Sequence, residues 1–337
     1  MMRHSGVADV SARYASRGRV LTASLVAALT VLVALPQARA DIAIDPAGKL
    51  KVFGDFRFRF ETDWNSHQAN GIERPDRDRA RIRARLGLRL QPTEVFALAL
   101  RVRTGSKDSQ QSPHITIADF DGNPTGDDDI LFDQWYGELK GESGWAWFGR
   151  KDFPFWKQNE LFWDDDATIA GAAFGYRRAA GSELDVRAGA FALPDGGVEF
   201  NGWMGAGQLV YVTKLGFAEL TLAGGLYALE GEAGAKFLRN GNGERDYVIG
   251  MTNLQARIQA LGQPLSFGLD LMHNFQDYST TDSDAFTAAN HDQTNGVVVQ
   301  TRLGSLDQGA SWLAGVYSDL RCQRLLCPGR LVSIRLG

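Results

Sequence analysis

The sequence predicts an all-β protein, an antiparallel transmembrane β-barrel with about thirteen strands present. Two observations carry this prediction. Apolar and charged residues alternate with a period of two along most of the chain, and long polar connections alternate with tight turns. In an outer-membrane barrel, alternate side chains face lipid and a wet interior, and short turns and long loops lie on opposite rims. A soluble sandwich has no reason to keep that alternation of loop lengths.

The clearest alternation is in residues 77–90, which read RDRARIRARLGLRL. Arginine stands at every second position from 77 to 85, and Ala, Ile, Ala and Leu fill positions 80, 82, 84 and 86. As a strand, this segment has one cationic and one apolar face, whereas a helix would scatter the arginines around its circumference. A soluble sheet could solvate such an arginine face. The alternation of strands, long loops and tight turns in the neighbouring segments favours the outer-membrane barrel over the soluble sheet.

Residues 1–40 are predicted to be a secretory signal peptide. Arginines precede an apolar run at 20–35, and the small-residue site Ala38-Arg39-Ala40 precedes Asp41. This order is typical of a cleaved signal, and the run is shorter than the roughly 18 residues of a membrane anchor. Cleavage after Ala40 would leave 31 basic and 39 acidic residues, a net charge of −8. That balance argues against nucleic acid as a partner.

Residues 41–321 are predicted to form one barrel domain, because a barrel cannot be divided without exposing strand edges. The long connections are expected on one rim and tight turns, such as Ala180-Gly181 and Lys214-Leu215, on the other. The strands are expected at 51–64, 77–90, 95–104, 129–140, 144–151, 168–179, 182–193, 203–214, 216–229, 245–261, 264–277, 294–304 and 310–320, and the long connections at 65–76, 105–128, 152–167, 194–202, 230–244 and 278–293.

Several motifs resemble those of the putative-porin family of Gram-negative outer membranes. They are FGDFRFRFE (53–61), DRARIRARLGL (78–88), RVRTGS (101–106), ILFDQWY (130–136), FGRK (148–151) and FWDDD (162–166). The resemblance covers most of residues 50–320. It implies a closed barrel of about sixteen strands that acts as a diffusion channel in the outer membrane. Export through the periplasm would involve periplasmic chaperones and the barrel-assembly machinery; the resemblance does not decide between a monomer and a homotrimer, or name a solute.

Residues 322–337 depart from this pattern. They lack a period of two and a terminal aromatic residue, and they contain both cysteines, Cys322 and Cys327. One hypothesis is a frameshift near Arg321, with roughly three C-terminal strands lost; the alternative is a natural, divergent tail. The cysteines could pair in an oxidising periplasm or be accidental products of a shifted frame. Without further ligands they do not indicate a metal site.

Arginines on three consecutive strands are the predicted pore-lining residues. They would form an electropositive wall that attracts small anionic solutes. In the alternative, the arginines form a structural ladder that is neutralised by inward acids such as Asp55 and Glu61. The set is Arg57, Arg59, Arg79, Arg81, Arg83, Arg85, Arg101 and Arg103.

The connection at 152–167 carries Asp164, Asp165 and Asp166, and its place is left open. It could fold inward as a constriction that faces the arginines, or remain a solvated external loop. A calcium site at this triad, or at residues 127–129, is the less favoured alternative because no EF-hand spacing is present.

The sequence offers little for catalysis. His273-Asn274 invites comparison with a hydrolase site on a barrel, but no serine is singled out beside it. We therefore predict no enzyme activity, no cofactor and no metal site. The predicted function is a passive channel for small hydrophilic, anionic solutes. The alternatives are an outer-membrane barrel enzyme, a structural barrel without conductance, and a non-functional truncated porin.

Overall fold

A computed structural model shows one antiparallel sheet of sixteen strands. The strands pair in chain order from β1 to β16, except that β5 lies off this path and pairs with β3. The structure describes residues 38–63, 75–106, 113–123, 125, 129–159, 162–193, 202–231, 246–281, 291–292, 294–304, 312–319 and 330–336. Within these ranges, no helix has the length and apolar character needed to cross a membrane.

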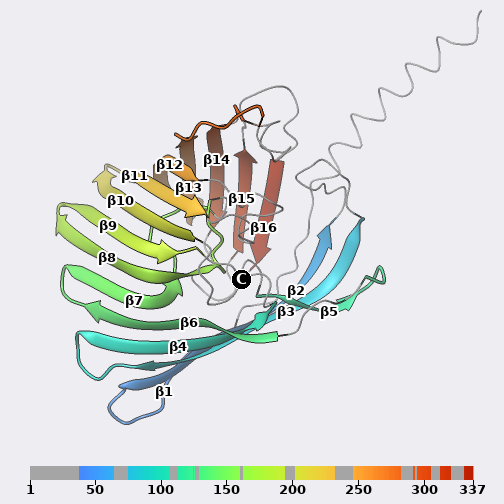
Figure 1. The fold of residues 1–337 in the computed structure, drawn as a ribbon, viewed down its shortest axis with the longest axis vertical. Coiled ribbons are helices and arrows are strands. Elements are labelled where there is room, and N and C mark those ends of the chain that lie inside the picture. The colour runs from blue at the N-terminus through green and yellow to red at the C-terminus, as the bar shows by residue number, and fades with distance from the viewer. Residues whose placement is uncertain are drawn as a thin grey trace, which may run out of the picture.

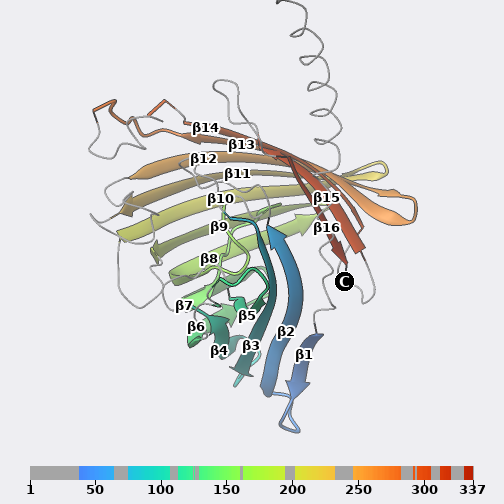
Figure 2. The same ribbon diagram turned by 90° about the vertical axis from the view of Figure 1, so that its right-hand side faces the viewer.

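The strands are β1 (Ala38–Ala43), β2 (Leu50–Asp63), β3 (Arg77–Leu90), β4 (Phe96–Gly105), β5 (Ile115–Asp119), β6 (Asp129–Lys140), β7 (Gly144–Asp152), β8 (Thr168–Ala180), β9 (Ser182–Ala192), β10 (Gly202–Leu215), β11 (Ala218–Gly231), β12 (Tyr247–Ala260), β13 (Gln263–Asn274), β14 (Asn295–Gly304), β15 (Trp312–Asp319) and β16 (Arg330–Leu336). The sheet curls around one concave side (Figures 1 and 2). In the described part of the chain, the pairing path starts at β1 and ends at β16 without joining them, so the barrel is open.

The predicted fold class is confirmed, and each of the thirteen expected strands coincides with one in the structure. The count of thirteen was too low, because β1, β5 and β16 were missed. These strands have only 6, 5 and 7 residues, too few for a period of two to stand out. β1 crosses the predicted cleavage site after Ala40, and β16 lies within the predicted tail 322–337. Cleavage and the frameshift both remain predictions.

One predicted turn was also misplaced. The expected turn at 214–215 instead falls after Leu215, where β10 ends, and before Ala218, where β11 begins. Gly216 has a φ of 62° there. This left-handed conformation is open to glycine at little cost and is rare for other residues, so the turn forms where the glycine stands.

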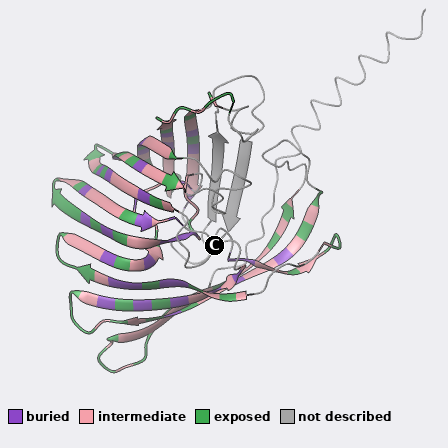
Figure 3. Ribbon diagram, viewed as in Figure 1, coloured by how far each residue is buried: buried purple, intermediate pink, exposed green. Residues whose placement is uncertain are grey.

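The two faces of the sheet differ in polarity, as the alternation predicted. Figure 3 shows burial classes that alternate along many strands. The outward positions expose large apolar side chains, which suits contact with lipid, whereas the inward positions hold buried polar residues such as Arg83, Gln208 and Asp270. Exposed outward residues include Leu86, Leu88, Leu98, Leu100, Phe148, Phe174, Leu209, Leu222, Leu226, Leu254, Phe267 and Leu271.

Candidate functional site

Strands β2, β3 and β4 place the predicted arginines side by side on one face. Arg57 is opposite Arg83 and Arg59 opposite Arg81, and Arg85 is opposite Arg103 on β4. Since alternate residues of a strand share a face, the whole set projects inward together. We call these eight residues the arginine face: Arg57, Arg59, Arg79, Arg81, Arg83, Arg85, Arg101 and Arg103.

Two carboxylates on β2, those of Asp55 and Glu61, form ion pairs with arginines of this face. Asp55 accepts hydrogen bonds from Arg83, at 2.7 Å from Nη2 to Oδ1, and from Arg85, at 2.6 Å from Nε to Oδ2. Glu61 pairs with Arg59, Arg79 and Arg81. Hydrogen bonds between ionised groups are about twice as strong as neutral ones, so these pairs brace β2 against β3.

A second carboxylate group lies on β6 and β7. Asp133 is 2% exposed and accepts a two-pronged contact from Arg101, with 3.0 Å from Nε to Oδ1 and 2.6 Å from Nη2 to Oδ2. Asp152 lies 3.6 Å from the same guanidinium and accepts a hydrogen bond of 2.7 Å from Gln134. This planar, two-pronged geometry favours arginine over lysine.

The arginine face is therefore largely neutralised and covered. Among the residues that the structure describes, six carboxylates lie beside its guanidiniums, those of Asp55, Glu61, Asp63, Asp133, Asp152 and Asp166. Arg83 and Arg103 are only 4% and 3% exposed. The alternative interpretation, a structural ladder of arginines neutralised by inward acids, thus describes part of the role of this face.

The connection at 152–167, here called the inner loop, crosses the concave side of the sheet. Asp166 contacts Arg83 on β3, whereas Gln158 donates a hydrogen bond to Asp270 on β13. Between these ends, Trp156 exchanges two backbone hydrogen bonds with the Gln208 side chain of β10, at 2.7 and 2.8 Å. A segment that touches β3, β10 and β13 must span the interior, so it is not an external loop.

Aromatic packing explains why the inner loop folds inward. Phe153 stacks on Trp163 with ring centroids 4.4 Å apart and planes 10° apart, and Phe162 lies 4.8 Å from Tyr227 of β11. Phe155 is 3% exposed and contacts Tyr227 at 5.4 Å. Each aromatic side chain buries roughly 150–250 Å². This apolar cluster packs against the inward residues of β7 to β12 and holds the inner loop on the concave side of the sheet.

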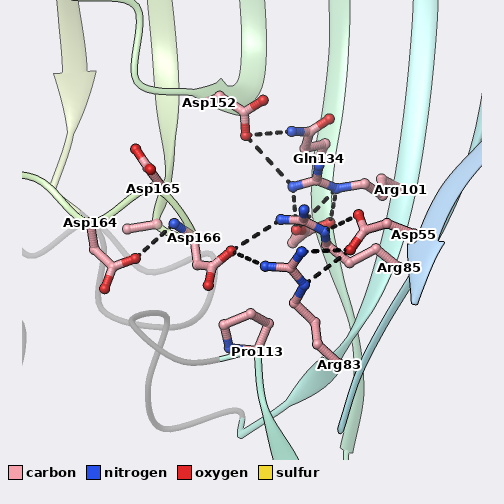
Figure 4. A network of polar contacts seen from close by, with 12 residues as sticks. Asp55, Arg83, Arg85, Arg101, Pro113, Gln134, Asp152, Asp164, Asp165 and Asp166 are labelled. Carbon is pink, nitrogen blue, oxygen red and sulfur yellow. Dashed lines mark hydrogen bonds and ion pairs between the residues drawn. The ribbon is translucent and has the colours of Figure 1, made fainter. Parts of the chain in front are cut away.

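The consecutive aspartates Asp164, Asp165 and Asp166 of the inner loop have different environments (Figure 4). Asp166 Oδ1 accepts hydrogen bonds from Arg83 at 2.8 Å and Arg85 at 3.2 Å. Asp164 Oδ1 accepts one of 2.7 Å from the Asp166 backbone, and burial raises the pKa of Asp164. Asp165 is 64% exposed and pairs with Lys157.

No three His, Cys, Asp or Glu side chains of the described residues are grouped in a way that could hold a metal ion. Residues 127 and 128, part of the second acidic run, lie outside the described residues.

Sequence reasoning missed a segment that covers the arginine face. Residues 113–119, here called the strap, contain β5 and lie along β3. Arg81 donates a hydrogen bond of 2.7 Å to the backbone oxygen of His114, and Thr104 one of 2.8 Å to that of Pro113. Five residues are too few to show a strand pattern, so the sequence carried no signal for it.

It also missed the inward acids Asp133 and Asp270, which are 2% and 4% exposed. Asp270 accepts hydrogen bonds from Asn253 at 2.5 Å and from Gln158 and Asn159 of the inner loop. A signal was available for Asp270, which is the single acid of β13, whereas β6 carries Asp129 and Glu138 besides Asp133. Such buried charges are rare unless partnered.

Residues 72–202 match the family described as putative porin. The putative-porin resemblance is confirmed. The matched part of the chain contains β3 to β9, the strap and the inner loop.

Solved structures also match the chain. One is titled Salmonella typhi OmpF complex with daunomycin; it is 14% identical, with a TM-score of 0.48, and the match covers 83% of this chain and 81% of that chain. No curated protein sequence matches.

Proposed function

We propose that the chain forms a passive diffusion channel in the outer membrane for small hydrophilic solutes, with a preference for anions. The observation that carries this proposal is the arginine face, where three neighbouring strands place eight guanidiniums on the same inward face. An excess of positive charge on an interior wall lowers the energy of an anion that passes it and raises that of a cation.

The inner loop supports the same proposal, because it crosses the concave side of the sheet beside the arginine face. Asp166 brings negative charge against Arg83 and Arg85, while the aromatic residues of the loop pack against β7 to β12. A solute would therefore pass between acidic and basic groups. An enzyme or a structural barrel without conductance remains the alternative, and the channel assay separates the two.

The test is the current through purified, refolded protein in planar lipid bilayers with a salt gradient across the membrane. We expect ohmic conductance and a reversal potential that shows anion preference. Neutralising Arg81 and Arg83 together (R81A/R83A) should weaken that preference. Each unit charge changes an ion's energy by about 0.6 kcal/mol at about 7 Å in water, close to a threefold factor.

The matched control is Arg178→Ala, because Arg178 of β8 is exposed, lies opposite the exposed Leu184 and shares the outward face with Phe174. Its anion preference should equal that of the wild type. Protein without conductance would refute the channel, and unchanged selectivity in R81A/R83A would refute the arginine wall.

The route to the membrane is part of the proposal. We infer export with loss of residues 1–40, followed by passage through periplasmic chaperones and the barrel-assembly machinery. The N-terminal sequence of protein from outer membranes should begin at Asp41. The mass of the detergent-solubilised protein distinguishes a monomer from a homotrimer.

A further inference from the structure

His114 is a residue of the strap, and its side chain is buried beside the arginine face. Its backbone oxygen accepts a hydrogen bond of 2.7 Å from Arg81 Nη2, and its side chain is 6% exposed. The preceding residue, Pro113, is fully buried and is fixed by Thr104 of β4. Hydrogen bonds to the backbone oxygens of Pro113 and His114 therefore fix the backbone that carries the imidazole.

The imidazole has an unmet hydrogen-bonding group. Its Nε2 atom is buried and has no hydrogen-bond partner among the residues that the structure describes. The same holds for the buried Nε atom of Arg59. Polar groups buried in this way destabilise the folded state unless something accepts their hydrogen bonds. An acceptor from outside the chain would satisfy both of these donors.

The surroundings of His114 are strongly cationic. Burial, followed by the guanidiniums of Arg59, Arg83, Arg81 and Arg57, lowers the pKa of His114 far below its usual range. The imidazole is therefore neutral at physiological pH. In the tautomer that carries its proton on Nε2, it donates a hydrogen bond without adding a further positive charge.

The geometry points to a saturable oxyanion-binding site, in which His114 Nε2 and Arg59 Nε donate hydrogen bonds to one phosphate or carboxylate group. Arg57 and Arg81 supply the surrounding positive potential. Charge-assisted hydrogen bonds to an anion are stronger than neutral ones. This inference rests on the proposed channel and deepens it, because it assigns the channel a specific binding site for an oxyanion in place of a general preference for anions.

The first experiment titrates inorganic phosphate or succinate against the chloride current of the reconstituted wild-type protein. We expect each to reduce the current along a saturating curve. His114→Leu should raise the half-blocking concentration about tenfold, since a hydrogen bond to a charged group is worth at least that factor. His114→Gln keeps an N–H donor and should stay within about threefold of the wild type.

The matched control is His273→Gln, because His273 is bonded to Asn295 on the outward face of β13. It should leave the block unchanged. If His114→Leu fails to refold, Arg57→Gln tests the same site from β2 and should also weaken the block. A block that does not saturate, or that is equal in all variants, overturns the site.

The second experiment separates the site from the channel. Isothermal titration calorimetry measures phosphate and succinate binding to the refolded protein in detergent, without any current. Binding that depends on His114 in a protein without conductance would keep the site and refute the channel. Conductance without such binding would keep the channel and refute the site. Binding of phosphate but not succinate would identify the oxyanion as phosphate.

Discussion

Asp166 and Arg83 lie 83 positions apart in the chain, yet their side chains are joined at 2.8 Å across the interior of the sheet. The contact links the inner loop to β3. Arg85 binds the same carboxylate oxygen at 3.2 Å. One aspartate thus fixes both the position of the loop and the charge that faces the arginines.

Asp166→Asn should increase the anion preference of the channel. The amide keeps the shape and the accepting oxygen but removes one negative charge beside Arg83 and Arg85. We expect a rise of about threefold in the ratio of anion to cation permeability, from about 0.6 kcal/mol at about 7 Å in water. The reversal potential in a salt gradient measures it. Asp165→Asn is the control, because Asp165 pairs with Lys157 and points away from the arginines; equal effects in both variants would contradict this role for Asp166.

Asp270→Ala should release the tip of the inner loop. The substitution leaves Asn253, Gln158 and Asn159 without their shared acceptor. The free energy of unfolding should fall by about 3 kcal/mol or more, at about 1–3 kcal/mol for each buried group left unsatisfied. Trypsin cleavage after Lys157, within the loop, should accelerate. Asp292→Ala changes an exposed acid and serves as the control; a loop that stays resistant to trypsin in Asp270→Ala would show that the aromatic cluster alone holds it.

Gly149→Ala should prevent or greatly slow refolding. Gly149 has a φ of 115°, and an added Cβ would lie 2.2 Å from the backbone oxygen of Trp135. Gly181→Ala is the matched variant, with a φ of 79° but no atom within 4 Å of the new Cβ. It should cost only about 1–2 kcal/mol, the usual penalty for a left-handed residue with a side chain. Thermal unfolding in detergent compares them, and similar losses would argue against the backbone clash.

Asp164→Asn should stabilise the protein at neutral pH. Burial raises the pKa of Asp164 above its ordinary value of 3.8, so ionising this group disfavours the folded state. The stability of the wild type should therefore fall as pH rises from 3.8 through the raised pKa, and the variant should escape that loss. Its advantage should vanish below pH 3.8, where Asp164 is protonated in both states. Melting temperatures measured across this range check it, and a pH-independent difference would refute the electrostatic cause.

The local pattern of the sequence predicted what is local in the structure. The period of two located β3 at residues 77–90 and placed Arg83 and Arg85 on one face, because strand geometry follows from neighbouring residues alone. It could not show that Asp166 meets Arg83, since that contact depends on how a loop packs across the whole sheet. The inner loop could have been recognised by its aromatic residues, such as Phe153 and Trp163, which a solvated loop would not bury. Nothing in the sequence marked the strap, whose β5 has only five residues.

The long-range contacts of the inner loop also determine when, during folding, the loop can pack inside the sheet. Its contact with Asp270 spans 112 positions in the chain, and its contact with Arg83 spans 83 in the opposite direction. Contacts between residues distant in the chain form slowly, because the chain loses conformational entropy before the contact contributes stabilising energy. Both β3 and β13 must be in place before the loop can bridge them. The inner loop should therefore be seated last, and a newly inserted molecule should leak more than a mature one.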